Sequence, residues 1–76
     1  TIRFDLARAG HVELCIYDAA GRRVKTLVNG TLAAGWNIGI PWTGFDDAGA
    51  RVPSGVYFYK LVTEDVTATK KMVLLQ

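Results

Sequence analysis

The stretch Trp36-Asn37-Ile38-Gly39-Ile40-Pro41-Trp42 decides the fold class of this chain. Large apolar side chains stand at every second position, which is the period of a β-strand with one buried face. Pro41 has no N–H to donate to a neighbouring strand, so we expect this strand to lie at a sheet edge or to become irregular there. The stretch therefore predicts one half-buried strand that contributes its apolar face to a core.

Segments with strand-like sequence lie on both sides of this stretch. We expect strands at Ile2–Leu6, Val12–Ile16, Val24–Val28, Trp36–Trp42, Val56–Thr63 and Val66–Leu75. Leu27 breaks the alternation of the third segment, and a β-bulge near Lys70-Lys71 would reconcile the two halves of the last one. Turn signals recur about every ten residues, and no segment has a helical period. The pattern predicts an antiparallel sandwich of six or seven short strands, with residues 1–76 in a single domain.

Two of the expected turns have the same chemistry. Asp18–Gly21 and Asp46–Gly49 both place Asp at the first position, where its side chain caps the turn, and Gly at the fourth. We expect Gly21 and Gly49 to take positive φ, because glycine does so without steric cost. Asn29-Gly30 is a further turn signal, and Ser54-Gly55 opens the strand that follows.

An aromatic and aliphatic core must hold the domain together. The chain has 76 residues and a single cysteine, Cys15, so it cannot form an internal disulfide. A domain of this size buries only about 60% of its unfolded surface. Phe45 and Phe58 are candidates either for the core or for exposed contact residues. We expect the core to contain Phe4, Leu14, Ile16, Trp36, Ile38, Trp42, Tyr57 and Leu61.

Composition excludes two classes of partner. Nine basic and seven acidic residues give a net charge of +2 and are scattered along the chain. A nucleic-acid surface would need clustered Lys and Arg. No apolar run approaches the ~20 residues of a membrane span. The adjacent pair Lys70-Lys71 is typical of charges that protect an exposed strand edge.

The residues present do not assemble a catalytic constellation. His11 and Cys15 lie on one strand roughly 13 Å apart, at about 3.3 Å per residue, which is beyond hydrogen-bond reach. One His and one Cys do not complete a zinc site. Asp46 and Asp47 leave calcium binding open, but the loop has no further carboxylate, and the favoured alternative is that Asp46 caps its turn and Asp47 is solvated. An aromatic face that binds sugar also stays open. We therefore expect a protein that is not an enzyme and that needs no cofactor or metal.

The whole chain resembles a known family. The resemblance rests on the opening Thr1–Phe4, the ending Lys70–Leu75, the shorter matches Val12–Asp18, Gly21-Arg22, Leu27-Val28 and Ala34-Gly35, and two longer internal segments. These segments read Trp42-Thr43-Gly44-Phe45-Asp46-Asp47-Ala48-Gly49 and Val52-Pro53-Ser54-Gly55-Val56-Tyr57-Phe58-Tyr59-Lys60-Leu61. They resemble the immunoglobulin-like domain named after the flagellar hook-capping protein, and the C-terminal sorting domain of type IX secretion. Thr43 departs from the Asp that the family usually has there, and we expect its hydroxyl to keep the turn.

The resemblance implies an all-β, immunoglobulin-like antiparallel β-sandwich of about seven short strands. It also implies that Tyr57 forms a tyrosine corner, in which its hydroxyl bonds back to the backbone. The expected role is that of a C-terminal sorting module of a longer secreted bacterial protein. Such a protein is exported through the periplasm to the outside or the cell surface.

In a sorting module, secretion machinery reads the last strand. The candidate recognition segment is Lys70, Lys71, Met72, Val73, Leu74 and Leu75. The alternative is a structural or protein-interaction module, either a hook-capping-like scaffold or a surface-assembly subunit that pairs through an edge strand. Both roles imply protein partners, and the second allows self-association through edge strands.

Overall fold

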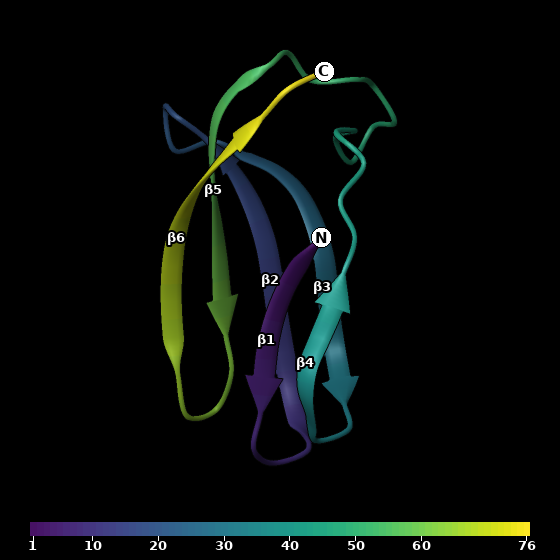
Figure 1. The fold of residues 1–76 in the computed structure, drawn as a ribbon, viewed down its shortest axis with the longest axis vertical. Helices are drawn as coiled ribbons and strands as arrows, with labels where there is room; N and C mark the ends of the chain where they lie inside the picture. The colour runs from purple at the N-terminus through teal and green to yellow at the C-terminus, as the bar shows by residue number, and fades with distance from the viewer.

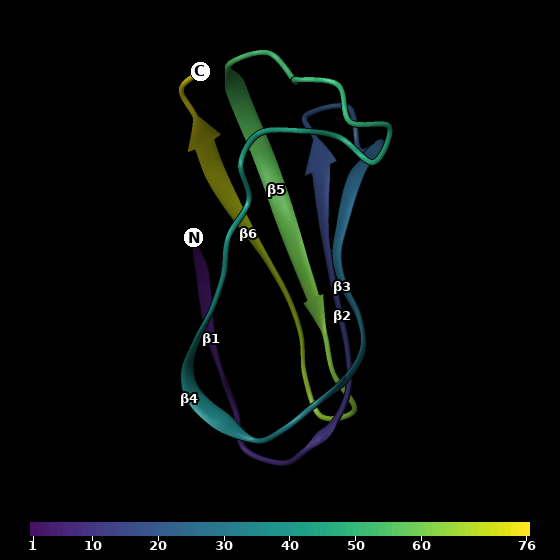
Figure 2. The same ribbon diagram turned by 90° about the vertical axis from the view of Figure 1, so that its right-hand side faces the viewer.

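Six β-strands and no helix make up the computed structural model, which describes all 76 residues. The strands are β1 (Ile2–Leu6), β2 (Gly10–Asp18), β3 (Arg23–Leu32), β4 (Gly35–Ile40), β5 (Gly55–Val62) and β6 (Thr67–Leu74) (Figure 1). One sheet pairs β1 with β4, and the other has the order β3-β2-β5-β6, with every pair antiparallel. In Figure 2 the β1–β4 pair lies against the lower part of the larger sheet. The predicted all-β, immunoglobulin-like sandwich is confirmed, and no helix is present that could cross a membrane.

The chain has six strands where the resemblance implies about seven. Residues 41–54, between β4 and β5, contain only an isolated bridge between Phe45 and Arg51. Prolines at both ends of this stretch and the positive φ of Gly44, 84°, interrupt the extended backbone. The stretch closes one end of the sandwich as a loop instead of adding a strand (Figure 1).

The core is centred on the inner face of β2. Val12, Leu14 and Ile16 have no exposed surface, because β3 and β5 flank β2 and the β1–β4 pair covers its inner face. Leu14, Ile16, Tyr57 and Leu61 are buried as predicted. Phe4, Ile38 and Trp42 are half-buried and pack against the core rather than lying within it.

Trp36, which the alternation predicts to be in the core, is 76% exposed. The reason is a β-bulge, in which Trp36 and Asn37 together stand opposite one residue of β1, Asp5. Asn37 has φ 54° and donates its backbone N–H to the Asp5 carboxylate at 2.7 Å. A slip of one residue moves side chains to the other face of a strand. The side chains of Ile38 and Ile40 therefore point toward the core, and that of Trp36 points away from it.

Two other local expectations are wrong. Asn29-Gly30 does not turn, because both residues pair with β2 inside the ten-residue strand β3. The bulges of the large sheet lie on β3, where the shifts let both Leu27 and Val28 pack on the core. β6 has no bulge near Lys70-Lys71, and its pairing with β5 keeps one register throughout. The continuous apolar run at its end needs no bulge, because Leu75 lies beyond the strand.

Tyr57 forms the predicted tyrosine corner. Its hydroxyl donates to the carbonyl oxygen of Pro53 at 2.7 Å, and Gly55 opens β5 as expected. The ring of Trp42 meets the ring of Tyr57 edge-on, with centroids 5.4 Å apart. The Trp42 indole N–H donates to the carbonyl oxygen of Phe45 at 2.9 Å. These contacts fix the 41–54 stretch over the end of the core.

The different burial of the two tryptophans predicts different costs of truncation. Trp42→Ala removes an aromatic pair and a hydrogen bond, so it should lower the free energy of unfolding by about 3 kcal/mol. Trp36→Ala, at an exposed site, should change it by no more than about 0.5 kcal/mol. Urea denaturation of both variants measures the difference, and equal losses would contradict this placement of the two indoles.

Candidate functional site

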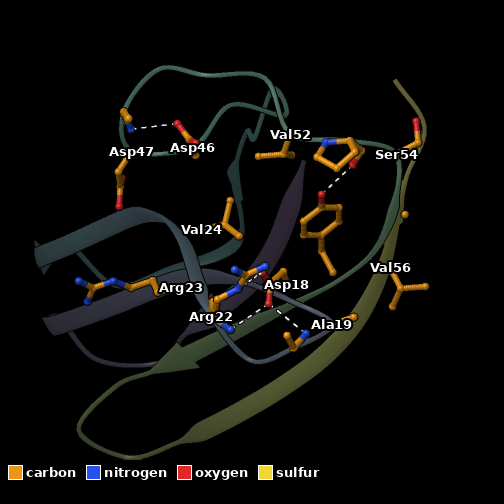
Figure 3. A pocket seen from close by; sticks show the side chains of 15 residues that line it. Asp18, Ala19, Arg22, Arg23, Val24, Asp46, Asp47, Val52, Ser54 and Val56 are labelled. Carbon is orange, nitrogen blue, oxygen red and sulfur yellow. Dashed lines mark hydrogen bonds and ion pairs between the residues drawn. The ribbon is translucent and has the colours of Figure 1, made fainter.

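A hollow of ≈ 810 Å³ lies at one end of the sandwich, between the two Asp–Gly turns (Figure 3). In the first turn, Asp18 Oδ1 accepts hydrogen bonds from the backbone N–H groups of Ala20 at 3.0 Å and Arg22 at 2.9 Å. The backbone N–H of Gly21 donates to the Asp18 carbonyl oxygen at 3.0 Å. The carboxylate that faces the hollow is therefore already engaged as the cap of its turn.

The second turn repeats this geometry. Asp46 Oδ1 accepts from Ala48 at 3.0 Å and Ala50 at 2.9 Å, and Gly49 donates to the Asp46 carbonyl oxygen at 3.0 Å. Gly21 and Gly49 have φ of 85° and 84°, the positive values that the sequence predicts. One turn design is thus used twice, and the hollow is the space that the two turns enclose.

Electrostatics in the hollow also reflect turn capping. The backbone N–H of Arg22 is the largest cause that lowers the pKa of the Asp18 carboxyl. Partial desolvation acts against it, and the Arg22 guanidinium, 3.0 Å from Asp18 Oδ2, adds to the lowering. The structure has no group of three or more His, Cys, Asp or Glu side chains placed to hold a metal ion. What Asp18 and Asp46 visibly do is order the two turns.

His11 and Cys15 are not brought together as a reacting pair. His11 is exposed, whereas Cys15 is buried on the outer side of β2. The Cys15 sulfur lies 3.8 Å from Glu13 Oε1 and 3.7 Å from Thr26 Oγ1. Cys15 therefore fills space between polar neighbours, as a small buried side chain does.

The candidate recognition segment Lys70–Leu75 lies along an open sheet edge. β6 pairs only with β5, and none of its backbone groups makes a hydrogen bond outside that pairing. Lys70 stands opposite Tyr59 and Lys71 opposite Phe58, so the two charges lie on opposite faces of the sheet. Val73 is 62% exposed. The outward N–H and C=O groups of β6 thus form a template for another strand.

The other edge of the same sheet is covered near the start of β3 by Asp47. Its backbone N–H donates to the carbonyl oxygen of Val24 at 3.0 Å, and its Oδ1 accepts the N–H of Thr26 at 3.2 Å. The Lys25 ammonium lies 3.7 Å from the same oxygen. Sequence reasoning treated Asp47 as a solvated side chain or a candidate calcium ligand. It contacts a strand 21 residues away, and no local sequence pattern predicts such contacts.

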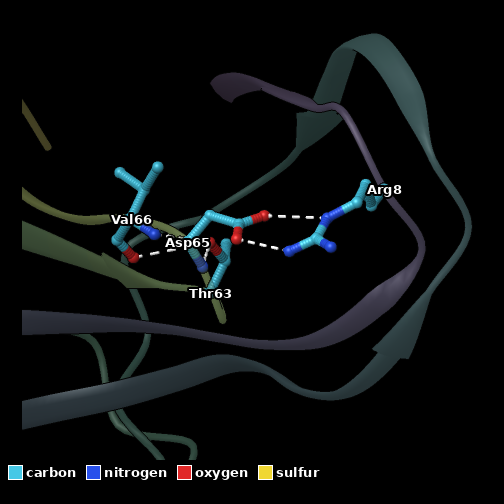
Figure 4. Close-up of polar contacts among 4 residues, drawn as sticks. All are labelled: Arg8, Thr63, Asp65 and Val66. Atoms are coloured by element: carbon cyan, nitrogen blue, oxygen red, sulfur yellow. Dashed lines mark hydrogen bonds and ion pairs between the residues drawn. The ribbon is translucent and has the colours of Figure 1, made fainter.

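The ends of β6 are held by side chains. At its start, Arg8 makes two hydrogen bonds to the Asp65 carboxylate, and Thr63 Oγ1 accepts the N–H of Val66 at 3.0 Å (Figure 4). Just past its end, the backbone N–H of Gln76 donates to Ser54 Oγ at 2.8 Å. β6 is therefore open along its edge but fixed at both ends.

Gln76 also fastens the 41–54 loop. Its side-chain Nε2 donates to the carbonyl oxygens of Gly44 at 3.0 Å and Val52 at 2.9 Å. A Cβ atom at Gly44 would lie 2.3 Å from that nitrogen, so glycine leaves the room that the amide occupies. Sequence reasoning missed Gln76, because its partners lie 24 and 32 residues away.

Comparison with known proteins found one family. A family model described as the FlgD Ig-like domain matches residues 1–67. Searches of curated proteins and of solved structures found no match. The matched range ends at the first residue of β6, so the segment Lys70–Leu75 lies outside it.

Gln76→Ala should destabilise the domain. Loss of the two amide hydrogen bonds leaves the Val52 carbonyl group unpaired, whereas the Gly44 carbonyl keeps the Val52 N–H as a donor, so we expect a cost of about 1–2 kcal/mol in the free energy of unfolding. Leu75→Ala is the matched control, because Leu75 is 86% exposed and should change stability by about 0.5 kcal/mol or less. Guanidinium denaturation that gave both variants the stability of the parent would contradict the anchoring role.

Proposed function

We propose a function for this chain from the fact that it belongs to the FlgD Ig-like domain family. It is a non-catalytic protein-interaction module that pairs its β6 edge with an extended segment of a partner protein. The mode is β-augmentation, in which main-chain hydrogen bonds supply affinity and side-chain contacts supply specificity.

The observation that carries this proposal is the difference between the edges of the two sheets. Asp47 covers the start of β3, two bulges interrupt the register of that strand, and a bulge at Trp36-Asn37 interrupts the short β1–β4 pair. β6 alone offers eight consecutive residues in one unbroken register with an uncovered outer side. Bulges and covering contacts are the usual protection of edges against pairing. Their absence from β6 supports pairing there.

The charges on β6 favour a different chain over a second copy of this one. Antiparallel pairing of two β6 strands over Thr67–Leu74 would place Lys70 of one copy opposite Lys71 of the other. Like charges directly opposite each other destabilise a strand pair. A partner strand with carboxylates at these two positions replaces that repulsion by attraction. The proposed occupant is therefore an extended segment with acidic residues at its centre.

The anchored ends of β6 favour pairing in place. A terminal strand can fray from its sheet at lower cost than an internal strand. Gln76 and the Arg8–Asp65 pair instead tie both ends to the domain. A strand held in this way is preorganised, which lowers the entropic cost of adding a neighbour.

The probe for this proposal is an eight-residue peptide of alternating Thr and Val with two adjacent glutamates at its centre. We expect it to slow the hydrogen exchange of outward-facing β6 amides, measured by NMR, and to bind more weakly as salt rises. A peptide with two lysines at the centre should not bind. The double variant Lys70→Glu, Lys71→Glu should bind the peptide with two lysines and no longer bind the peptide with two glutamates.

A matched control separates the edge from net charge. Arg3→Glu with Arg23→Glu makes the same change in charge at exposed positions that form no ion pair and lie on strands that do not touch β6. This variant should keep the preference for the acidic peptide. The proposal would be refuted if neither double variant changed the preference for the acidic peptide. It would also be refuted if peptide binding protected amides outside β6.

The second candidate is the sorting role. Its support is the segment Lys70–Leu75, in which both lysines, Val73 and Leu75 are exposed and which resembles the ending of type IX sorting domains. In this role the partner is the secretion machinery, and the parent protein passes through the periplasm to the outside or the cell surface. A hook-capping-like scaffold would use the same edge to join neighbouring subunits.

Export of a reporter distinguishes these roles. Residues 1–76 are fused to the end of a periplasm-directed reporter in a bacterium that has type IX secretion. In the sorting role the fusion reaches the medium, and Lys70→Glu with Lys71→Glu traps it in the periplasm. The Arg3→Glu, Arg23→Glu control should still be exported. Retention of the unaltered fusion would exclude the sorting role and leave the scaffold role.

A further inference from the structure

The exposed indole of Trp36 is held by a strained backbone. Asn37 is the only non-glycine residue with positive φ, at 54°, and the Asp5 carboxylate fixes it through a 2.7 Å hydrogen bond. Bulges commonly re-aim a side chain, and strained positions persist where the surrounding structure enforces them. Here the enforced conformation leaves a tryptophan 76% exposed, although tryptophan side chains are on average largely buried.

The surroundings of Trp36 on the outer face of the β1–β4 pair are polar. Asp5 stands opposite the bulge, and Arg3, two residues away on β1, stands opposite Gly39. The Arg3 guanidinium lies 3.0 Å from where a Gly39 Cβ would be, so it covers the glycine. The side chains of Arg3 and Asn37 form no hydrogen bond or ion pair, and only one oxygen of Asp5 is engaged.

We infer that this face binds a neutral carbohydrate, with Trp36 as its stacking platform. A pyranose ring has an apolar face of C–H groups and a rim of hydroxyls. The C–H face can stack on the indole of Trp36. The hydroxyls can form hydrogen bonds with the free donors of Arg3 and Asn37 and with the free oxygen of Asp5. The opposite charges of Arg3 and Asp5 offset each other, which favours a neutral sugar over a charged one.

The polar setting also favours a glycan over a protein partner. A tryptophan that anchors a protein interface sits within a desolvated, apolar centre surrounded by a polar rim. No other apolar side chain of β1 points to the outer face, where Arg3 and Asp5 stand, and the β4 residue opposite Arg3 is Gly39. The site lies on a different sheet from β6, so it is independent of the proposed strand pairing.

Fluorescence of a single tryptophan tests this site directly. The chain has two tryptophans, so Trp42→Phe leaves Trp36 as the only one. Cellohexaose and xylohexaose are the probes, and saturable binding of either should shift the Trp36 emission to shorter wavelength. In native gels that contain the corresponding polysaccharide, Trp36→Ala should weaken retardation of the otherwise unaltered chain by about tenfold or more.

A second variant separates the platform from its polar neighbours. Asn37→Gly keeps a residue that tolerates positive φ, so the bulge remains while the side-chain amide is lost. It should weaken retardation by a smaller factor than Trp36→Ala. Unchanged emission and retardation with both glucose and xylose polymers would overturn the proposal. A Trp36-dependent response to the acidic peptide in place of the glycans would also overturn it and assign this face to a protein.

Discussion

The inner face of β2 is the constraint on which the rest of the structure depends. Val12, Leu14 and Ile16 are completely buried, and no disulfide adds to their effect. A chain of this length buries a limited fraction of its surface, so both β2 neighbours and the β1–β4 cover are needed to keep these side chains from water. Tyr57 and Trp42 then close the end of the same core. Only strand edges and side chains that are not needed to bury this core are available for surface contacts.

The open edge of β6 follows from that arrangement. A four-stranded sheet that does not close into a barrel has two edges, and the loop that closes the core also carries Asp47, which covers the start of β3. The same loop holds Gln76, so it fixes the end of β6 without covering its side. The 41–54 loop therefore covers the start of the β3 edge and leaves the β6 edge open to a partner. This combination suits a module whose partner adds a strand to a rigid template.

Local chemistry made much of the fold predictable, and contacts between distant residues made the rest unpredictable. Alternation located the strands, and the Asp–Gly spacing predicted the positive φ of Gly21 and Gly49, because both effects act within a few residues. Trp36 was misplaced because its bulge depends on Asp5, 32 residues away. Asn29-Gly30 stayed extended because pairing with β2 outweighs its turn preference. For the candidate site, the sequence located Lys70–Leu75 but not Asp47 or Gln76, whose roles exist only after folding.

Amide hydrogen exchange of the free domain, read residue by residue by NMR, tests the central claim most directly. If β6 is a docked strand with an open edge, alternate amides along Thr67–Leu74 exchange as exposed groups, while those between them, bonded to β5, are protected. The Thr26 amide on β3 should be protected by Asp47. Protection of every β6 amide in the monomer, or of none, would contradict the account.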